Sequence, residues 1–291
     1  MKRPGRCIPC IAFLLFLVTV IPAHGQDEHL PYGISQPDAQ VLHRNAYDVQ
    51  YDFIYRIPMW VAYHLIPEYR KTPERKGRFK SFRTDESVQN PVKDADYTNS
   101  GYARGHLAPF FISGGDRDGD GKYAKDDPDD ELTVYQINYM SNITPQSQKC
   151  FNGSGAVWYQ LEEFERKLVD EHNAEIWSYA GSVFNNENYY IYVIGPNEDI
   201  AVPDAFFKII LQKQADGTIT ALAFLFPHYE EVHGQCNDDN KDFDDPSHFV
   251  SVDDIEALTG VDFFPDLPDG QEIYLEGINT KKIWDAFYSD Y

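Results

Sequence analysis

The chain has 291 residues, and its 47 acidic and 25 basic residues give a net charge of −22 at pH 7. Such a charge disfavours any function that relies on overall electrostatic attraction to nucleic acid, because nucleic-acid binders neutralise phosphates with clustered Lys and Arg. No apolar run is long enough to span a bilayer comfortably, so we do not expect a membrane-spanning protein. Neither a repeat nor a Pro/Gly/Ser linker divides the sequence.

The first 25 residues are typical of a secretory signal peptide. Lys2, Arg3 and Arg6 precede an apolar run over residues 11–21, and a small-residue exit follows at 23–25. We therefore expect a signal peptide over 1–25, a single domain over 26–291, and a secreted or periplasmic location. The segment 1–25 carries three basic residues and no acidic one, so the remaining chain has a net charge of −25, three lower than the −22 of the whole.

Periodicity predicts strands and helices mixed without regular βαβ alternation, which favours the α+β class. Residues 156–172 have apolar positions at helical spacing, and Ser154 is a candidate N-cap. Residues 252–259 predict a second helix, with acidic residues in its first turn and Gly260 as its stop. Strands are predicted from β-branched and aromatic content at 60–66, 132–139, 176–183, 189–194, 205–212 and 218–226.

Two cysteines lie beyond the signal, Cys150 and Cys236. In an oxidising compartment a disulfide between them is reasonable. The sequence alone does not establish whether the two residues meet.

The segment DYTNSGYARGHLAP, residues 96–109, contains residues suited to phosphodiester hydrolysis. This reaction requires a base for water, positive charge for the transition state and help for the leaving oxygen. Arg104 and His106 are two positions apart around Gly105. On an extended strand this spacing places both side chains on one face.

A second segment, MSNITPQ at 140–146, is followed by Phe151-Asn152 and by the predicted helix with Glu162. Together these segments resemble the DNA/RNA non-specific endonucleases, the ββα-metal nucleases that include endonuclease G. WVAYHL at 60–65, VPDAFFK at 202–208, AFLF at 223–226 and the segments 252–260 and 267–269 resemble that family in the same order. The resemblance implies a ββα-metal fold with a mixed or antiparallel central sheet flanked by helices.

The resemblance also implies roles for individual residues. His106 matches the general base, Arg104 the arginine near the scissile phosphate, and Asn142 the asparagine beside the base. Asn152 matches the one side chain that ligates Mg²⁺ directly, for which Mn²⁺ can substitute, and Glu162 matches the acid that holds metal-bound water. A further family arginine lies upstream, and either Arg78 or Lys80 could fill its place. The family usually has Asp where this chain has Ala103.

The acidic insertion at 114–131 resembles a calcium loop of the EF-hand type. Asp116, Asp118 and Asp120 occupy positions 1, 3 and 5, Gly121 position 6 and Asp127 position 12. We therefore expect structural Ca²⁺ here, with a solvated acidic loop as the alternative.

We expect a secreted Mg²⁺-dependent endonuclease that hydrolyses DNA and RNA without sequence specificity and leaves 5′-phosphate ends. Two alternatives stay open at this point: a phosphodiesterase for small nucleotides, and a secreted calcium-binding module whose nuclease site has decayed. The sequence does not define the oligomeric state.

Overall fold

The computed structural model describes residues 28–36, 40–184, 191–214, 217–228 and 242–288. The signal-peptide segment expected at 1–25 lies outside them. Within the described residues, no helix is both long enough and apolar enough to cross a membrane.

A six-stranded antiparallel sheet forms the centre of the fold, with the strand order β11-β10-β7-β4-β3-β2. Its middle strands are buried on both faces, so they are almost continuously apolar rather than alternating. The strands are β2 (Val41–His43), β3 (Asp48–Asp52), β4 (Ile57–Leu65), β7 (Ile176–Val183), β10 (Ala205–Lys213) and β11 (Ile219–Pro227).

Three two-stranded sheets surround the central one. They pair β1 (Ile34–Ser35) with β12 (Asp262–Phe263), β5 (Ala103–His106) with β6 (Ile143–Gln146), and β8 (Val193–Ile194) with β9 (Ile200–Ala201). The α-helices are α1 (Pro128–Ile137), α2 (Val157–Asp170), α3 (Val252–Thr259), α4 (Asp269–Gly277) and α5 (Lys281–Phe287). Short helical turns are η1 (Pro67–Tyr69), η2 (Gly77–Phe79), η3 (Asp94–Tyr97), η4 (Phe110–Ile112), η5 (Met140–Asn142), η6 (Gln148–Asn152) and η8 (Pro246–His248).

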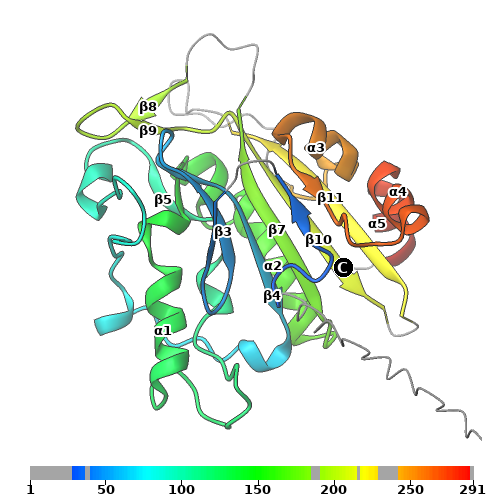
Figure 1. Ribbon diagram of the computed structural model, residues 1–291, viewed down its shortest axis with the longest axis horizontal. Helices are drawn as coiled ribbons and strands as arrows, with labels where there is room; N and C mark the ends of the chain where they lie inside the picture. The colour runs from blue at the N-terminus through cyan, green and yellow to red at the C-terminus, as the bar shows by residue number, and fades with distance from the viewer. Residues whose placement is uncertain (1–27, 37–39, 185–190, 215–216, 229–241, 289–291) are drawn as a thin grey trace, which may run out of the picture.

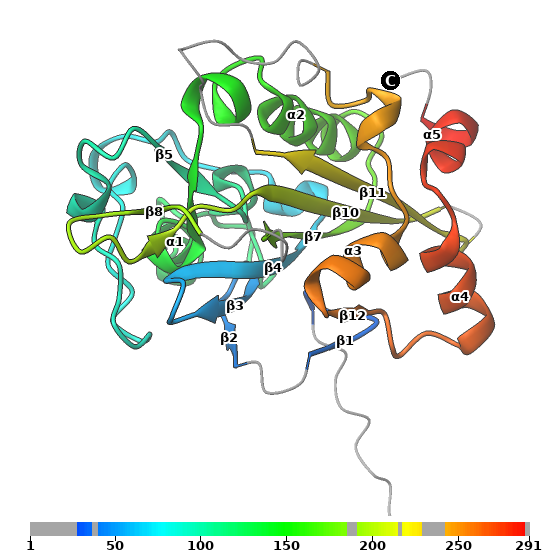
Figure 2. The same cartoon turned by 90° about the horizontal axis from the view of Figure 1, so that it is seen from above.

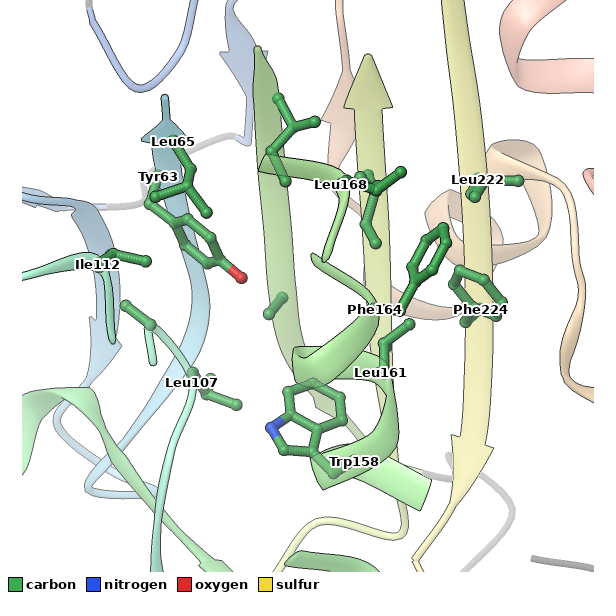
Figure 3. Packing of buried hydrophobic residues seen from close by; sticks show 14 of the residues in the cluster. Tyr63, Leu65, Leu107, Ile112, Trp158, Leu161, Phe164, Leu168, Leu222 and Phe224 are labelled. Carbon is green, nitrogen blue, oxygen red and sulfur yellow. The ribbon is translucent and has the colours of Figure 1, made fainter. Parts of the chain in front are cut away.

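The helices cover the two faces of the central sheet. Helix α2 lies against one face, and α3 lies against the other together with β1 and β12 (Figures 1 and 2). Leu161, Phe164 and Leu168 of α2 point towards the sheet and pack near Leu222 and Phe224 of β11 (Figure 3). The α2 face predicted from apolar spacing is therefore the buried one, and the sheet fixes the position of this helix.

Most predicted elements match the structure, because their patterns reflect burial. The strand predicted at 176–183 and the helix at 252–259 have the observed bounds, and Gly260 ends α3 with a left-handed φ of 70°. The strand predicted at 189–194 is described only from residue 191 and is a strand at Val193–Ile194. Ser154 is not the N-cap of α2, which begins after Ala156 without a side-chain cap.

The strand predicted at 132–139 is wrong, since most of this segment belongs to α1. Asp127 caps the helix by accepting from the Asp129 N–H, and Pro128 occupies its first turn. The buried positions 130, 133, 134 and 137 recur at helical spacing. These start signals and this spacing outweigh the strand preference of Thr133, Val134 and Tyr135.

Candidate active site

A ββα unit gathers the side chains selected from the sequence. Strand β5 carries Arg104 and His106 and pairs with β6, and the chain then passes through η6 to α2. Gly105 is required between the two because a Cβ there would collide with the Gln146 side chain across the strand pair. One cavity of about 440 Å³ is lined by Arg75, Phe82, Ala103, Arg104, His106, Phe110, Gln148, Asn152 and Glu162.

Asn138, at the end of α1, fixes the His106 ring. Its amide nitrogen donates to the Val134 carbonyl at 2.9 Å and the Phe79 carbonyl at 3.4 Å. Its Oδ1 atom therefore faces His106 Nε2, at 3.3 Å, and acts as an acceptor. Nε2 must carry the proton, which leaves Nδ1 as the basic nitrogen of the ring.

The environment of His106 keeps its imidazole neutral. Burial, followed by the positive charge of Arg75, lowers the pKa of His106 from 6.5 to about 3, against a smaller opposing effect of Asn138. At neutral pH the ring is therefore able to accept a proton.

Two arginines contribute positive charge to the cavity. Arg75 lies between the rings of Phe82 and Phe110, with its guanidinium carbon 4.9 and 5.3 Å from their centroids. Arg104 pairs with Asp94 and donates to the Asp94 carbonyl at 2.6 Å. These contacts hold both guanidinium groups at the cavity, where their planar donors suit a phosphate.

Asn152 ends η6, a turn of π-helix, and its N–H donates to the Ser147 carbonyl at 2.9 Å. Within the described part of the chain, its side-chain amide has no hydrogen bond. Cys150, in the same turn, is disulfide-bonded. Its expected partner Cys236 lies outside the described residues, so that pairing stays a prediction.

Glu162 points into the same cavity from α2, and its environment disfavours its charge. Burial raises the pKa of Glu162 from 4.5 to about 7; Lys208 opposes the rise and Glu165 adds to it. An amide oxygen and a carboxylate in one cavity form the oxygen-donor set of a hard divalent cation that keeps most of its water.

Not every residue selected from the sequence faces the cavity. Asn142 is fully buried; its Oδ1 accepts from the Ala108 N–H, and its amide donates to the carbonyls of Ala108 and Ile137, each at 2.9 Å. It therefore holds the segment after His106 in place and has no free group for catalysis. The upstream arginine that lines the cavity is Arg75, and neither Arg78 nor Lys80 does so.

Arg78 instead pairs with Glu131 at 2.8 Å and lies over the Phe79 ring. Arg75, Asn138 and Gln148 belong to the site or contact it, but the sequence patterns do not identify them. The seven basic residues between 70 and 83 are a local sequence signal that could have pointed to Arg75. Asn138 and Gln148 lie in no recognisable local pattern, because their places at the site depend on tertiary structure.

In the insertion, carboxylate oxygens of Asp116, Asp118 and Asp120 lie within 4.8 Å of one another. Asp127 is not in that group; its Oδ1 atom caps α1, and its Oδ2 atom lies 3.8 Å from Lys122 Nζ.

The arrangement of β5, β6 and α2 around one hydrolytic cavity defines a ββα-metal nuclease fold. A chain from the crystal structure of the EndoG/EndoGI complex has a similar fold, with a TM-score of 0.64 and 25% identity over 83% of this chain and 92% of that chain.

Sequence comparison agrees with the fold. Residues 25–270 match the DNA/RNA non-specific endonuclease family, and the chain belongs to it. It is 28% identical over 241 residues to a nuclease of Serratia marcescens, covering 80% of this chain and 78% of that protein. It is also 28% identical over 247 residues to the mitochondrial nuclease EXOG of Danio rerio, covering 81% of this chain and 64%, just under two thirds, of that protein.

Proposed function

We propose that this protein is an exported, Mg²⁺-dependent endonuclease that hydrolyses DNA and RNA with His106 as the general base. The observation that carries the proposal is the shared cavity of a neutral histidine, two arginines and two oxygen donors. An intact set of this kind supports a working nuclease over a decayed one.

In this proposal, His106 Nδ1 takes a proton from the attacking water while Asn138 holds the Nε2–H. A phosphodiester beside the ring raises the pKa of His106, because negative charge stabilises the imidazolium. Arg75 and Arg104 bind the non-bridging phosphate oxygens and stabilise their charge in the transition state.

Asn152 and Glu162 are the residues that would hold Mg²⁺, Asn152 directly and Glu162 through the ion's water. The ion, when bound, supplies positive charge to the phosphate and its leaving oxygen. In this proposal all these groups contact the phosphate and none contacts a base edge, so we expect cleavage without sequence selectivity. Products with 5′-phosphate ends are part of the proposal.

The acidic chain approaches a polyanion through a local basic segment. Residues 70–83 contain seven basic residues and one acidic residue, and Arg75 and Phe82 of this segment line the cavity. Lys76, Arg78 and Lys80 are exposed. This segment supplies the local positive charge that the net charge of −22 lacks.

Export is supported by the leader pattern and by the disulfide-bonded Cys150, because disulfides persist in oxidising compartments. The function is tested by incubating purified protein with supercoiled plasmid and with RNA, in Mg²⁺ or EDTA. We expect nicking, linearisation and degradation of both polymers in Mg²⁺ only. Hydrolysis confined to small nucleotide diesters would contradict the proposal.

A further inference from the structure

The acidic insertion forms a compact turn whose carboxylates converge. Asp116 Oδ1 accepts from the Gly119 N–H, and its Oδ2 from the Gly121 N–H, each at 2.8 Å. Gly119 and Gly121 have φ values of 77° and 81°, a conformation that favours glycine. The turn leaves Asp116, Asp118 and Asp120 with oxygens within 4.8 Å of one another.

An independent feature beside this turn is the buried carboxylate of Asp130. Asp130 is only 4% exposed, and its Oδ2 atom has no hydrogen-bond partner. It lines a cavity of about 350 Å³ together with Asp118. A buried acceptor without a partner is costly, and here a cation would satisfy it.

Lys122 currently supplies positive charge to the turn. Its ammonium group pairs with Asp120 and lies 3.8 Å from Asp127 Oδ2. The Lys122 side chain is exposed and flexible, so it can leave when a metal ion enters.

We propose that the insertion is a structural Ca²⁺ site, with Asp116, Asp118 and Asp120 as carboxylate ligands and Asp130 as the buried counter-charge. Several carboxylates on a flexible turn suit Ca²⁺, which accepts six to eight oxygens, better than Mg²⁺, which requires a near-ideal octahedron. This proposal differs from the sequence-based expectation, because Asp127 Oδ1 caps α1 and the buried Asp130 supplies the additional negative charge beside the three ligands.

Helix α1 connects this site to the candidate active site. It begins after Asp127 and ends at Asn138, which holds the His106 ring. Its ten residues span about 15 Å. The cation is therefore too far away to take part in hydrolysis, and its role is to fix the helix that positions the base. Phe79, Ala124 and Val134 also pack together, so the insertion supports the basic segment.

This proposal does not depend on nuclease activity, so its test uses binding and stability. CaCl₂ is titrated into metal-free protein by calorimetry, and the melting temperature is measured with and without 1 mM CaCl₂. For a Kd near 10 µM, we expect about one equivalent bound and a rise of at least about 5 °C. MgCl₂ at the same concentration should give much less.

The Asp116→Asn/Asp120→Asn variant and the Asp130→Asn variant should each weaken Ca²⁺ binding at least about tenfold. Asp126→Asn, an exposed change in the same insertion, is the matched control and should bind like wild type. Lys122→Ala should bind Ca²⁺ more tightly, because it removes the competing ammonium. Absence of calorimetric binding by wild-type protein, or equal binding by the Asp116/Asp120 variant and wild type, would overturn the proposal.

Discussion

Replacing Lys208 by Met removes the positive charge from a buried ion pair beneath the candidate site. Lys208 Nζ donates to Glu165 Oε2 at 2.7 Å and to the Tyr63 hydroxyl at 3.0 Å, and both charged side chains are 0% exposed. Glu165 also accepts from Tyr63 and Ser178, at 2.7 and 2.6 Å. The pair joins β10 to the face of α2 that carries Glu162.

Lys208→Met leaves the Glu165 carboxylate buried with two hydroxyl donors and no counter-charge. Breaking a buried pair in this way costs about 3–5 kcal/mol of unfolding free energy. For a protein of this size, each kcal/mol lowers the melting temperature by about 2–4 °C, so we expect a decrease of about 6–20 °C.

The assay is urea denaturation followed by circular dichroism, on Lys208→Met, Glu165→Gln and the double variant. The double variant removes both charges, so it should cost clearly less than the sum of the single changes, with a coupling of at least about 2 kcal/mol. Lys213→Met, at the exposed end of the same strand, is the control and should change stability by about 0.5 kcal/mol or less. A Lys208→Met cost below about 1 kcal/mol would refute the reasoning.

Three further predictions concern the site itself. Burial raises the pKa of Glu162 from 4.5 to about 7, so the folded state prefers the protonated carboxyl. The stability that this preference contributes is fully present below pH 4.5 and is lost as pH rises through 7. Glu162→Gln should therefore stabilise metal-free protein at pH 8 by about 1–3 kcal/mol and reduce cleavage at least about tenfold. Asn138→Asp places a carboxylate beside His106 Nε2, which raises the His106 pKa, so cleavage should fall as pH drops through the new value. Lys76→Gln/Lys80→Gln should weaken duplex DNA binding and reduce the slope of log K against log salt by about 1.8.

The measurements differ for the three. Thermal unfolding in EDTA tests Glu162→Gln, and an unchanged melting temperature at pH 8 would count against the buried charge. A pH–rate profile tests Asn138→Asp, which should differ from wild type only on the acid side. Fluorescence anisotropy of a short duplex tests the lysine pair, with Lys281→Gln/Lys282→Gln on α5 as the control that removes the same two charges. An equal loss in that control would mean that the charge effect is not local.

Sequence patterns predicted the parts of this protein where each signal is local. The β-branched and aromatic content of β7 and the apolar spacing on α2 are properties of neighbouring residues, and the Arg104–His106 spacing follows from strand geometry. Family resemblance supplied Asn152 and Glu162, which the structure brings into one cavity.

Other features depend on contacts between distant segments, so no local pattern indicates them. Asn138 meets His106 across 32 positions, and Lys208 meets Glu165 across 43. Asn142 stands in a motif, yet its polar atoms are all used by backbone groups. The strand prediction fails over α1 because the middle of this helix is rich in strand-forming residues, while its start signals lie in an acidic loop.

The most direct measurement of the central claim is plasmid cleavage by His106→Ala compared with wild type, at pH 8 in Mg²⁺. In the described part of the chain, no other side chain of the cavity is both neutral and basic at this pH. Circular dichroism and DNA binding should match wild type, while the cleavage rate should fall by about 10²–10⁴-fold. A folded His106→Ala protein that keeps more than about a tenth of the wild-type rate would contradict the assignment of His106 as the base.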